Sequence, residues 1–322
     1  MSRPFTPRTR VSSYVSAWMP TGDETRQSVA GYFGGGIDSA GNLSGIDKVA
    51  FPADTKSTLS ATLTTARRSQ AGYANSGVAG YFAGGSDTNF ISDIDKITFP
   101  ADSKTTLSAT LTTAREALAG YANTGIAGYS LGGGDSVGNL SGIDKITFPA
   151  DTKTTLSATL SGLRINFAGM ADFGVAGYSA GGNTTSNFVW TSGIDKITFP
   201  ADTKTTLAAT LSSARSQLAG VADSGVAGYF GGGYDGSSSL SGIDKIAFPA
   251  DTKTTLSTTL SVTRRLFAGM ADSGKAGYFG GGYQYLSSID KIAFPAETIT
   301  TLSATLTTGR AYLAAMADCG VF

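Results

Sequence analysis

The chain repeats one sequence unit six times, and this repetition limits the possible folds more than any other feature. The tripeptide Ile-Asp-Lys marks each copy and begins at Ile46, Ile94, Ile143, Ile194, Ile243 and Ile289. Successive copies lie 48, 49, 51, 49 and 46 residues apart. A second marker, Gly-Tyr, recurs with its tyrosine at Tyr32, Tyr81, Tyr129, Tyr178, Tyr229 and Tyr278. Periods of this length are typical of supersecondary units that stack in a row or close into a ring.

Each unit predicts four short strands. In the copy that opens at Arg115, we expect strands over 117–122, 126–133, 142–148 and 154–160. The turn Asn123-Thr124-Gly125 separates the first two, and 149–152 separates the last two. In the last segment apolar and hydroxyl side chains alternate with a period of two, which indicates a strand. A helix is disfavoured there because its Thr and Ser residues are poor helix formers.

The two ends of the repeat region complete each other. The first copy begins at Val29 with a second strand, and the last copy stops just after a first strand. A ring in which the last strand completes the first blade leaves no open sheet edge. We therefore predict an all-β, six-bladed propeller over 28–322. Residues 1–27, which contain Pro4, Pro7 and Pro20, are expected to form an extended arm.

A family resemblance follows from three motifs. Tyr-x-x-Gly-Gly occurs in all six copies, an arginine opens each unit, and an aromatic-turn-Thr element runs from Phe148 to Thr152 in the third copy. Together they resemble the Kelch repeat, which implies a Kelch-type β-propeller over about 28–322. The tryptophan of the Kelch fourth strand is replaced here by Leu59, Leu107, Leu156, Leu207, Leu256 and Leu302. The chain is also similar to Kelch-like virion proteins of tailed, particularly marine, bacteriophages, which implies a virion location.

The composition argues against several functions. Lys plus Arg and Asp plus Glu balance at 24 each, so no basic field favours nucleic acid. The chain has no histidine and one cysteine, which removes Cys/His zinc sites, histidine copper ligands and the commonest general base. No apolar run approaches the roughly 20 residues that span a bilayer. We expect no metal, no cofactor, no catalytic residues and no membrane insertion, and we expect that the protein is not an enzyme.

Most of the charges are repeated, because they belong to the Ile-Asp-Lys and Ala-Asp-Thr-Lys segments. We expect these Asp and Lys side chains to form cross-strand ladders.

An arginine also recurs at each junction between blades, at Arg67, Arg115, Arg164, Arg215, Arg264 and Arg310. Two interpretations stay open for this arginine ring. The arginines could hydrogen-bond backbone carbonyls between blades, for which the planar guanidinium is suited. They could instead form a collar that attracts anions at the mouth of the channel.

The loop between the second and third strands is the least repetitive part of each unit. Its aromatic residues are Phe90, Phe188, Trp190, Tyr234, Tyr283 and Tyr285. Strand alternation places these loops and the arginine ring on the same face, and loops on a rigid scaffold commonly bind ligands. Trp190 is the leading candidate for a binding anchor because Trp and Tyr dominate interface hot spots. The alternative is a tryptophan that folds down over neighbouring loop residues.

These observations favour a non-enzymatic virion structural or host-attachment protein. Its arm, residues 1–27, would bind other virion proteins, and its loops would bind a glycan or protein on the host surface. The alternative is a cytoplasmic Kelch-type adaptor that binds an acidic peptide over the arginine ring.

Overall fold

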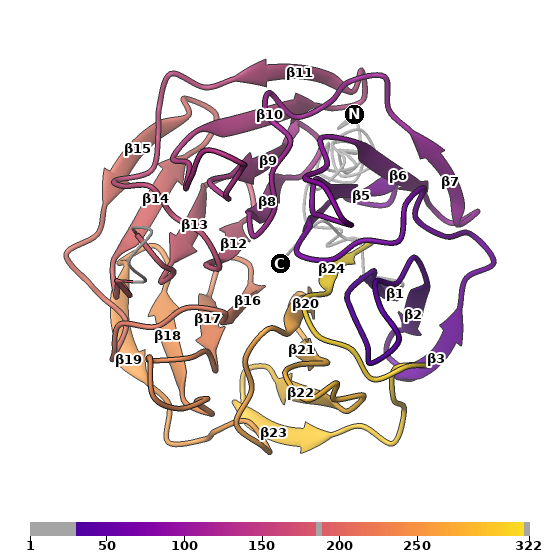
Figure 1. Ribbon diagram of the computed structural model, residues 1–322. Coiled ribbons are helices and arrows are strands. Elements are labelled where there is room, and N and C mark those ends of the chain that lie inside the picture. The colour runs from indigo at the N-terminus through magenta and orange to yellow at the C-terminus, as the bar shows by residue number, and fades with distance from the viewer. Residues whose placement is uncertain (1–29, 185–188, 319–322) are drawn as a thin grey trace, which may run out of the picture.

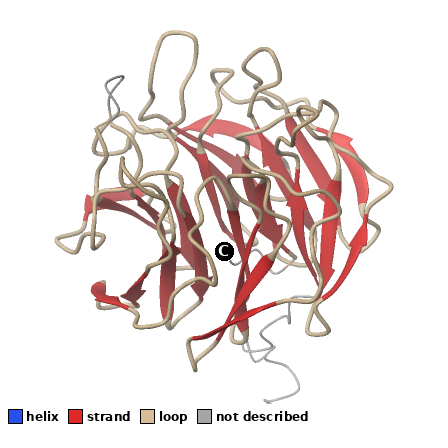
Figure 2. Ribbon diagram, turned by 60° about the horizontal axis from the view of Figure 1, so that its bottom comes forward, coloured by secondary structure: helices blue, strands red, loops and turns tan. Residues whose placement is uncertain are grey.

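The computed structural model describes residues 30–184 and 189–318, which form six four-stranded antiparallel sheets arranged as blades around a central axis (Figure 1). These residues contain strands and loops but no helix (Figure 2). Accordingly, no helix in the described segments is long and apolar enough to cross a membrane. The prediction of an all-β, six-bladed propeller is confirmed. The predicted arm, 1–27, lies outside the described residues.

Every blade uses its strands in the same order from the axis outward. The innermost strands are β24 (Ala314–Ala317), β4 (Ala71–Asn75), β8 (Ala119–Asn123), β12 (Ala168–Asp172), β16 (Ala219–Asp223) and β20 (Ala268–Asp272). The second strands are β1 (Ala30–Gly34), β5 (Ala79–Ala83), β9 (Ala127–Leu131), β13 (Ala176–Ala180), β17 (Ala227–Gly231) and β21 (Ala276–Gly280). The third strands are β2 (Ile46–Ala50), β6 (Ile94–Thr98), β10 (Ile143–Thr147), β14 (Ile194–Thr198), β18 (Ile243–Ala247) and β22 (Ile289–Ala293). The outer strands are β3 (Thr55–Thr58), β7 (Ser103–Thr106), β11 (Thr152–Thr155), β15 (Thr203–Thr206), β19 (Thr252–Thr255) and β23 (Thr298–Thr301). We number the blades 1 to 6 in the order of these lists.

The ring closes as predicted, because blade 1 takes its innermost strand from the far end of the repeat region. Strand β24 pairs antiparallel with β1, in a register that sets Gly31 opposite Ala317 and Phe33 opposite Ala315. The first and last repeats therefore belong to one sheet, and blade 1 has four strands like the other five.

Small residues let the innermost strands approach one another closely around the axis. Gly72, Gly120, Gly169, Gly220 and Gly269 occupy equivalent positions, and blade 1 has Ala315 there. A Cβ atom on Gly120 would lie 2.9 Å from the carbonyl oxygen of Gly72, and a Cβ atom on Gly72 would lie 2.3 Å from that of Ala315. Glycine is required at these positions because neighbouring backbones occupy the space of a side chain.

Aromatic stacking joins each blade to the next one. The tyrosine of each second strand stacks on the phenylalanine that ends the third strand of the following blade, as in Tyr32 with Phe99, whose ring centroids are 5.0 Å apart. The series closes where Tyr278 of blade 6 stacks on Phe51 of blade 1. These tyrosines are almost fully buried, so each of the six seams removes a large aromatic side chain from water.

Charged side chains also join neighbouring blades. The expectation that the Asp and Lys side chains form cross-strand ladders is therefore only partly correct. Lys48 lies 2.7 Å from the Oδ2 atom of Asp102 in the next blade, and the Tyr32 hydroxyl donates to Oδ1 of that carboxylate at 2.8 Å. The same arrangement recurs at every seam. Cross-strand Lys–Asp pairs within one sheet occur in five blades but are longer, at 3.3–3.9 Å. The shortest lysine–carboxylate pairs lie between blades, because the carboxylate in the turn between third and fourth strands reaches the preceding blade.

The predicted position of the fourth strand was wrong. In blade 3 it runs over Thr152–Thr155 and not over 154–160. Beyond Thr155 the chain crosses toward the next blade, and its next backbone hydrogen bonds are from Leu156 to Ile143 and from Leu160 to Ser141. The crossover is extended, with Leu160 buried and Thr159 exposed, so it imitates the alternation of a strand without forming a ladder.

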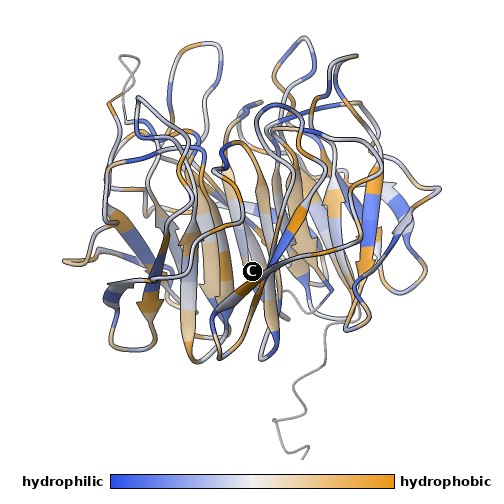
Figure 3. Cartoon of the chain, turned by 90° about the horizontal axis from the view of Figure 1, so that it is seen from below, coloured by the Kyte–Doolittle hydropathy of each residue, from blue (hydrophilic) through white to orange (hydrophobic). Residues whose placement is uncertain are grey.

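The two faces of the propeller differ in character. One face carries the long loops between second and third strands, and we call it the loop face (Figure 3). The other carries the tight hairpins between first and second strands, and we call it the hairpin face. Exposed apolar side chains recur at equivalent hairpin positions at Val78, Ile126, Val175 and Val226. The hairpin face therefore repeats one exposed apolar position in four blades, whereas the loop face differs from blade to blade.

Replacing Gly72 by alanine tests the close approach of the innermost strands. Gly72→Ala is expected to lower the free energy of unfolding by about 1–3 kcal/mol, because the new methyl group overlaps a backbone carbonyl that cannot move aside. Urea denaturation measures the change. Gly142→Ala is the matched control, since nothing lies within 4 Å of a Cβ atom there. Equal effects of the two substitutions would contradict the steric explanation.

Candidate functional site

The arginine ring is buried, and each of its arginines is paired with an aspartate within the fold. The six side chains are 0–3% exposed. Each guanidinium lies 2.6–3.3 Å from the aspartate of an Ile-Asp-Lys segment, in the pairs Arg67–Asp95, Arg115–Asp144, Arg164–Asp195, Arg215–Asp244, Arg264–Asp290 and Arg310–Asp47. These aspartates are also buried. A buried carboxylate needs such a partner, because taking an unpaired charge out of water costs several kcal/mol.

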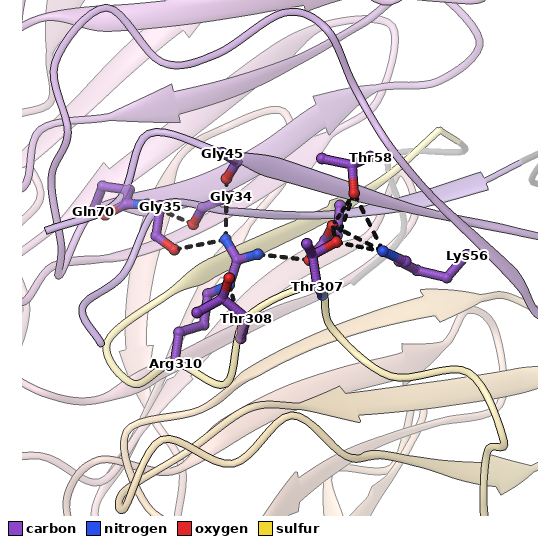
Figure 4. A network of polar contacts seen from close by, with 10 residues as sticks. Gly34, Gly35, Gly45, Lys56, Thr58, Gln70, Thr307, Thr308 and Arg310 are labelled. Atoms are coloured by element: carbon purple, nitrogen blue, oxygen red, sulfur yellow. Dashed lines mark hydrogen bonds and ion pairs between the residues drawn. The ribbon is translucent and has the colours of Figure 1, made fainter. Parts of the chain in front are cut away.

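The pair that closes the ring, Arg310 and Asp47, has an extensive set of hydrogen bonds (Figure 4). Arg310 donates from Nη2 to Asp47 at 2.6 Å and from Nη1 to the carbonyl oxygens of Gly35 and Gly45 at 3.2 and 3.1 Å. The Asp47 carboxylate also accepts from the backbone N–H and hydroxyl of Thr307, and from the hydroxyl of Thr58. Side chains thus reinforce the closure that β24 and β1 make through their backbones.

These contacts keep the carboxylates of Asp47 and Asp95 charged inside the protein. Burial acts to raise the pKa of Asp47, but hydrogen bonds from Thr307 and the charge of Arg310 outweigh it and hold this pKa below its ordinary value. In Asp95, burial is again opposed, here first by the Arg67 charge and then by hydrogen bonds from Thr64, and its pKa is also lowered.

The arginines therefore follow the first of the two interpretations. They bind carbonyls and carboxylates within the fold, and they present no exposed charge at the mouth of the channel. We do not retain Arg67, Arg115, Arg164, Arg215, Arg264 and Arg310 among the candidate ligand-binding residues.

The aromatic residues of three loops gather on the loop face. Trp190 of blade 4 meets Tyr234 of blade 5 edge to face, with centroids 6.2 Å apart and planes at 73°. The Arg265 guanidinium lies 4.3 Å from the Tyr234 ring and 4.0 Å from the Tyr283 ring of blade 6. We call Trp190, Tyr234, Arg265 and Tyr283 the aromatic cluster. It links blades 4, 5 and 6 through stacking and cation–π contacts.

Trp190 itself is half-buried, and it packs against the loop of the next blade. Its ring lies close to Gly236, where an added Cβ atom would come within 2.9 Å of it. The Tyr234 hydroxyl donates to the carbonyl of Gly236 at 2.8 Å, which fixes that loop beneath the indole. The Trp190 indole N–H has no hydrogen-bond partner among the described residues. Trp190 therefore combines a fixed position with an unused donor.

The remaining predicted aromatics lie apart from one another. Tyr285 is 44% exposed in the same loop as Tyr283, which is 46% exposed. Phe90 lies in the loop of blade 2, away from the aromatic cluster in the chain, and is 36% exposed. Phe188 falls outside the described residues.

Sequence reasoning missed Arg265. Arg265 directly follows the ring arginine Arg264, and the two arginines of this dipeptide have different roles. The sequence contains one signal that points to Arg265: the residue after the ring arginine differs between almost all the blades.

No protein-family model matches the chain, and no curated protein is significantly similar to it. The six-bladed propeller is shown by the structure, and the resemblances to Kelch repeats and to phage virion proteins stay predictions.

Replacing Asp47 by asparagine tests the buried pair that closes the ring. Asp47→Asn leaves Arg310 charged, buried and without its carboxylate, so we expect a loss of about 3–5 kcal/mol in the free energy of unfolding at neutral pH. Lys56→Ala is the control, because the partly exposed Lys56 lies 3.7 Å from the same carboxylate and its removal should cost about 1 kcal/mol or less.

The pH dependence of this loss supplies a second check. Because the pKa of Asp47 is lowered in the folded state, its stabilisation is present above the ordinary value of about 3.9 and disappears as pH falls through the folded value. The difference between wild type and Asp47→Asn should therefore shrink below about pH 4. A difference that stays constant down to pH 2 would show that the charge of Asp47 does not stabilise the fold.

Proposed function

We propose that this protein is a non-enzymatic virion component, structural or host-attaching, that binds a protein or glycan through its loop face. The propeller fold fits a protein-binding role, since it holds loops of varied sequence on a rigid ring. The aromatic cluster is the observation that carries the proposal. It assembles Trp, Tyr and Arg, the residue types that dominate interface hot spots, on the face whose loops differ from blade to blade.

The resemblance to virion proteins of tailed phages supports the virion location. The asymmetry of the two faces also suits an attachment protein. Strand β1 begins at the hairpin face, and that face displays Val78, Ile126, Val175 and Val226 at 43–50% exposure. We propose that residues 1–27 and these four apolar side chains bind an apolar surface of a neighbouring virion protein, which leaves the loop face free for the host.

The alternative, a cytoplasmic adaptor that binds an acidic peptide over the arginine ring, receives no support from the geometry. The arginines that would attract the peptide are buried and paired with aspartates.

Alanine substitutions in the aromatic cluster test the binding face. Trp190→Ala and Tyr283→Ala are each expected to weaken binding to host cells by roughly 30-fold, because truncation of a hot-spot residue costs about 2 kcal/mol or more. Val137→Ala is the control, since Val137 is 94% exposed on a loop of the same face and belongs to no cluster. The measurement is the binding of labelled protein to host cells, and unchanged binding of both cluster variants would refute the proposal.

Deletion of residues 1–27 tests the virion location separately. The shortened chain should fold with an unchanged melting temperature, because the described propeller begins at Ala30, but it should no longer join particles. Quantifying the protein in purified virions measures this. Incorporation at the wild-type level would refute docking through the arm.

A further inference from the structure

The two residues after each ring arginine vary more than their neighbours. They are Arg68-Ser69, Glu116-Ala117, Ile165-Asn166, Ser216-Gln217, Arg265-Leu266 and Ala311-Tyr312, and no pair occurs twice. The arginine before them is present in every blade, and an alanine follows two residues later in every blade. Besides the loops between second and third strands, the sequence therefore has a second variable point in each repeat, immediately before the innermost strand.

The fold holds these residues in a closed ring around the mouth of the channel on the loop face. The second residue of each pair donates its backbone N–H to the carbonyl of the equivalent residue in the preceding blade. The hydrogen bonds run from Ser69 to Tyr312, from Ala117 to Ser69, from Asn166 to Ala117, from Gln217 to Asn166, from Leu266 to Gln217 and from Tyr312 to Leu266, at 2.6–3.0 Å. All six residues have φ between 55° and 60°. Their backbones are fixed alike, and only their side chains differ.

Part of this ring borders a cavity of about 280 Å³ between the loops of blades 2 and 3. Its wall includes Arg68, Phe90, Glu116, Asn139, Asn166 and Tyr312. This volume is just below the roughly 300–1,000 Å³ of typical small-molecule sites, so it suits a single small ring rather than a peptide.

The charges that line the cavity are not paired with each other. Among the described residues, Arg68 has no carboxylate within 4.0 Å, and Glu116 has no cationic nitrogen within that distance. Arg68 donates to the side chain of Asn42 at 3.3 Å, and Glu116 accepts from the hydroxyl of Ser86. The buried Nδ2 atom of Asn139 has no hydrogen-bond partner in the described part of the chain. The cavity therefore offers unpaired donors and acceptors at fixed positions.

This combination selects for a neutral ligand rich in hydroxyl groups. An anion would be repelled by Glu116 and by Asp135, which also borders the cavity, and a cation would be repelled by Arg68, whereas a neutral ligand meets neither repulsion. A hydroxyl can donate to Glu116 or accept from Arg68, and the amides of Asn139 and Asn166 can do both. Phe90 and Ile165 supply apolar surface for the C–H face of a sugar ring.

The geometry points to a binding site for a neutral monosaccharide unit in this cavity, which we call the mouth pocket. The inference rests on the proposed function, because it assigns the sugar of a host glycan to a particular place on the loop face. No residue of the aromatic cluster borders the mouth pocket, so the two sites can be tested independently.

Titration with methyl glycosides of neutral hexoses and N-acetylhexosamines, followed by protein-detected NMR, tests the mouth pocket. At least one glycoside is expected to bind the full chain with a dissociation constant in roughly the millimolar range. Asn166→Ala should weaken this binding about tenfold, since it removes a hydrogen-bonding partner from the pocket. Gln217→Ala is the matched control, because Gln217 holds the same position in the backbone ring but does not border the pocket. Glu116→Gln keeps the shape of the side chain and should also weaken binding, which guards against a folding defect in Asn166→Ala.

Three results would overturn the inference: no glycoside binds, Gln217→Ala weakens binding as much as Asn166→Ala, or a free zwitterionic amino acid binds more tightly than every glycoside. Trp190→Ala should leave glycoside binding unchanged. If glycosides fail to bind while Trp190→Ala abolishes attachment to host cells, the mouth pocket is wrong and the proposed function stands. If glycosides bind the pocket but no variant affects attachment, the proposed function is wrong and the pocket stands.

Discussion

The structure depends on a buried carboxylate in every blade and on the arginine that neutralises it. Asp47 and its five equivalents are almost completely removed from water. Each needs a cation and several hydrogen bonds, because an unpaired buried charge would cost several kcal/mol. The arginine that meets this need sits where the chain passes from one blade to the next. The pairing of this arginine with its aspartate fixes the path of the crossover. The path of the crossover in turn sets the position at which the next innermost strand begins.

This constraint also explains where variation is allowed. Since the arginine is held by its aspartate and by backbone carbonyls, the next two residues are placed at the mouth of the channel whatever their identity. Their backbones form a closed hydrogen-bonded ring that uses no side-chain atoms. Ser69, Asn166 and Tyr312 can therefore differ without disturbing the fold, and the same holds for the loops that carry Trp190 and Tyr283. A rigid repeated framework thus surrounds a small set of residues free to acquire binding properties.

The hairpin face, by contrast, is constrained by contacts between blades. Its turns between third and fourth strands carry the carboxylates that bind the tyrosine and lysine of the preceding blade, as Asp102 does for Tyr32 and Lys48. Burial raises the pKa of Tyr32 well above its ordinary value, and the hydrogen bond to Asp102 adds to this effect, so the phenol stays a donor at physiological pH. These contacts repeat at all six seams, and this face consequently has little freedom to vary.

The sequence by itself determined the number of blades, the number of strands in each and the closure of the ring, because these depend on local periodicity and on complementary ends. It could not place the outer strand correctly, since the crossover over 156–160 has the alternation of a strand but makes only isolated backbone hydrogen bonds and forms no ladder. Only the tertiary structure decided that Lys48 pairs with the next blade, that Arg310 is buried, and that Arg265 lies between Tyr234 and Tyr283. The reason is physical: these contacts join residues that are adjacent only after the blades pack around the axis, and no local pattern records which side chains will then face each other.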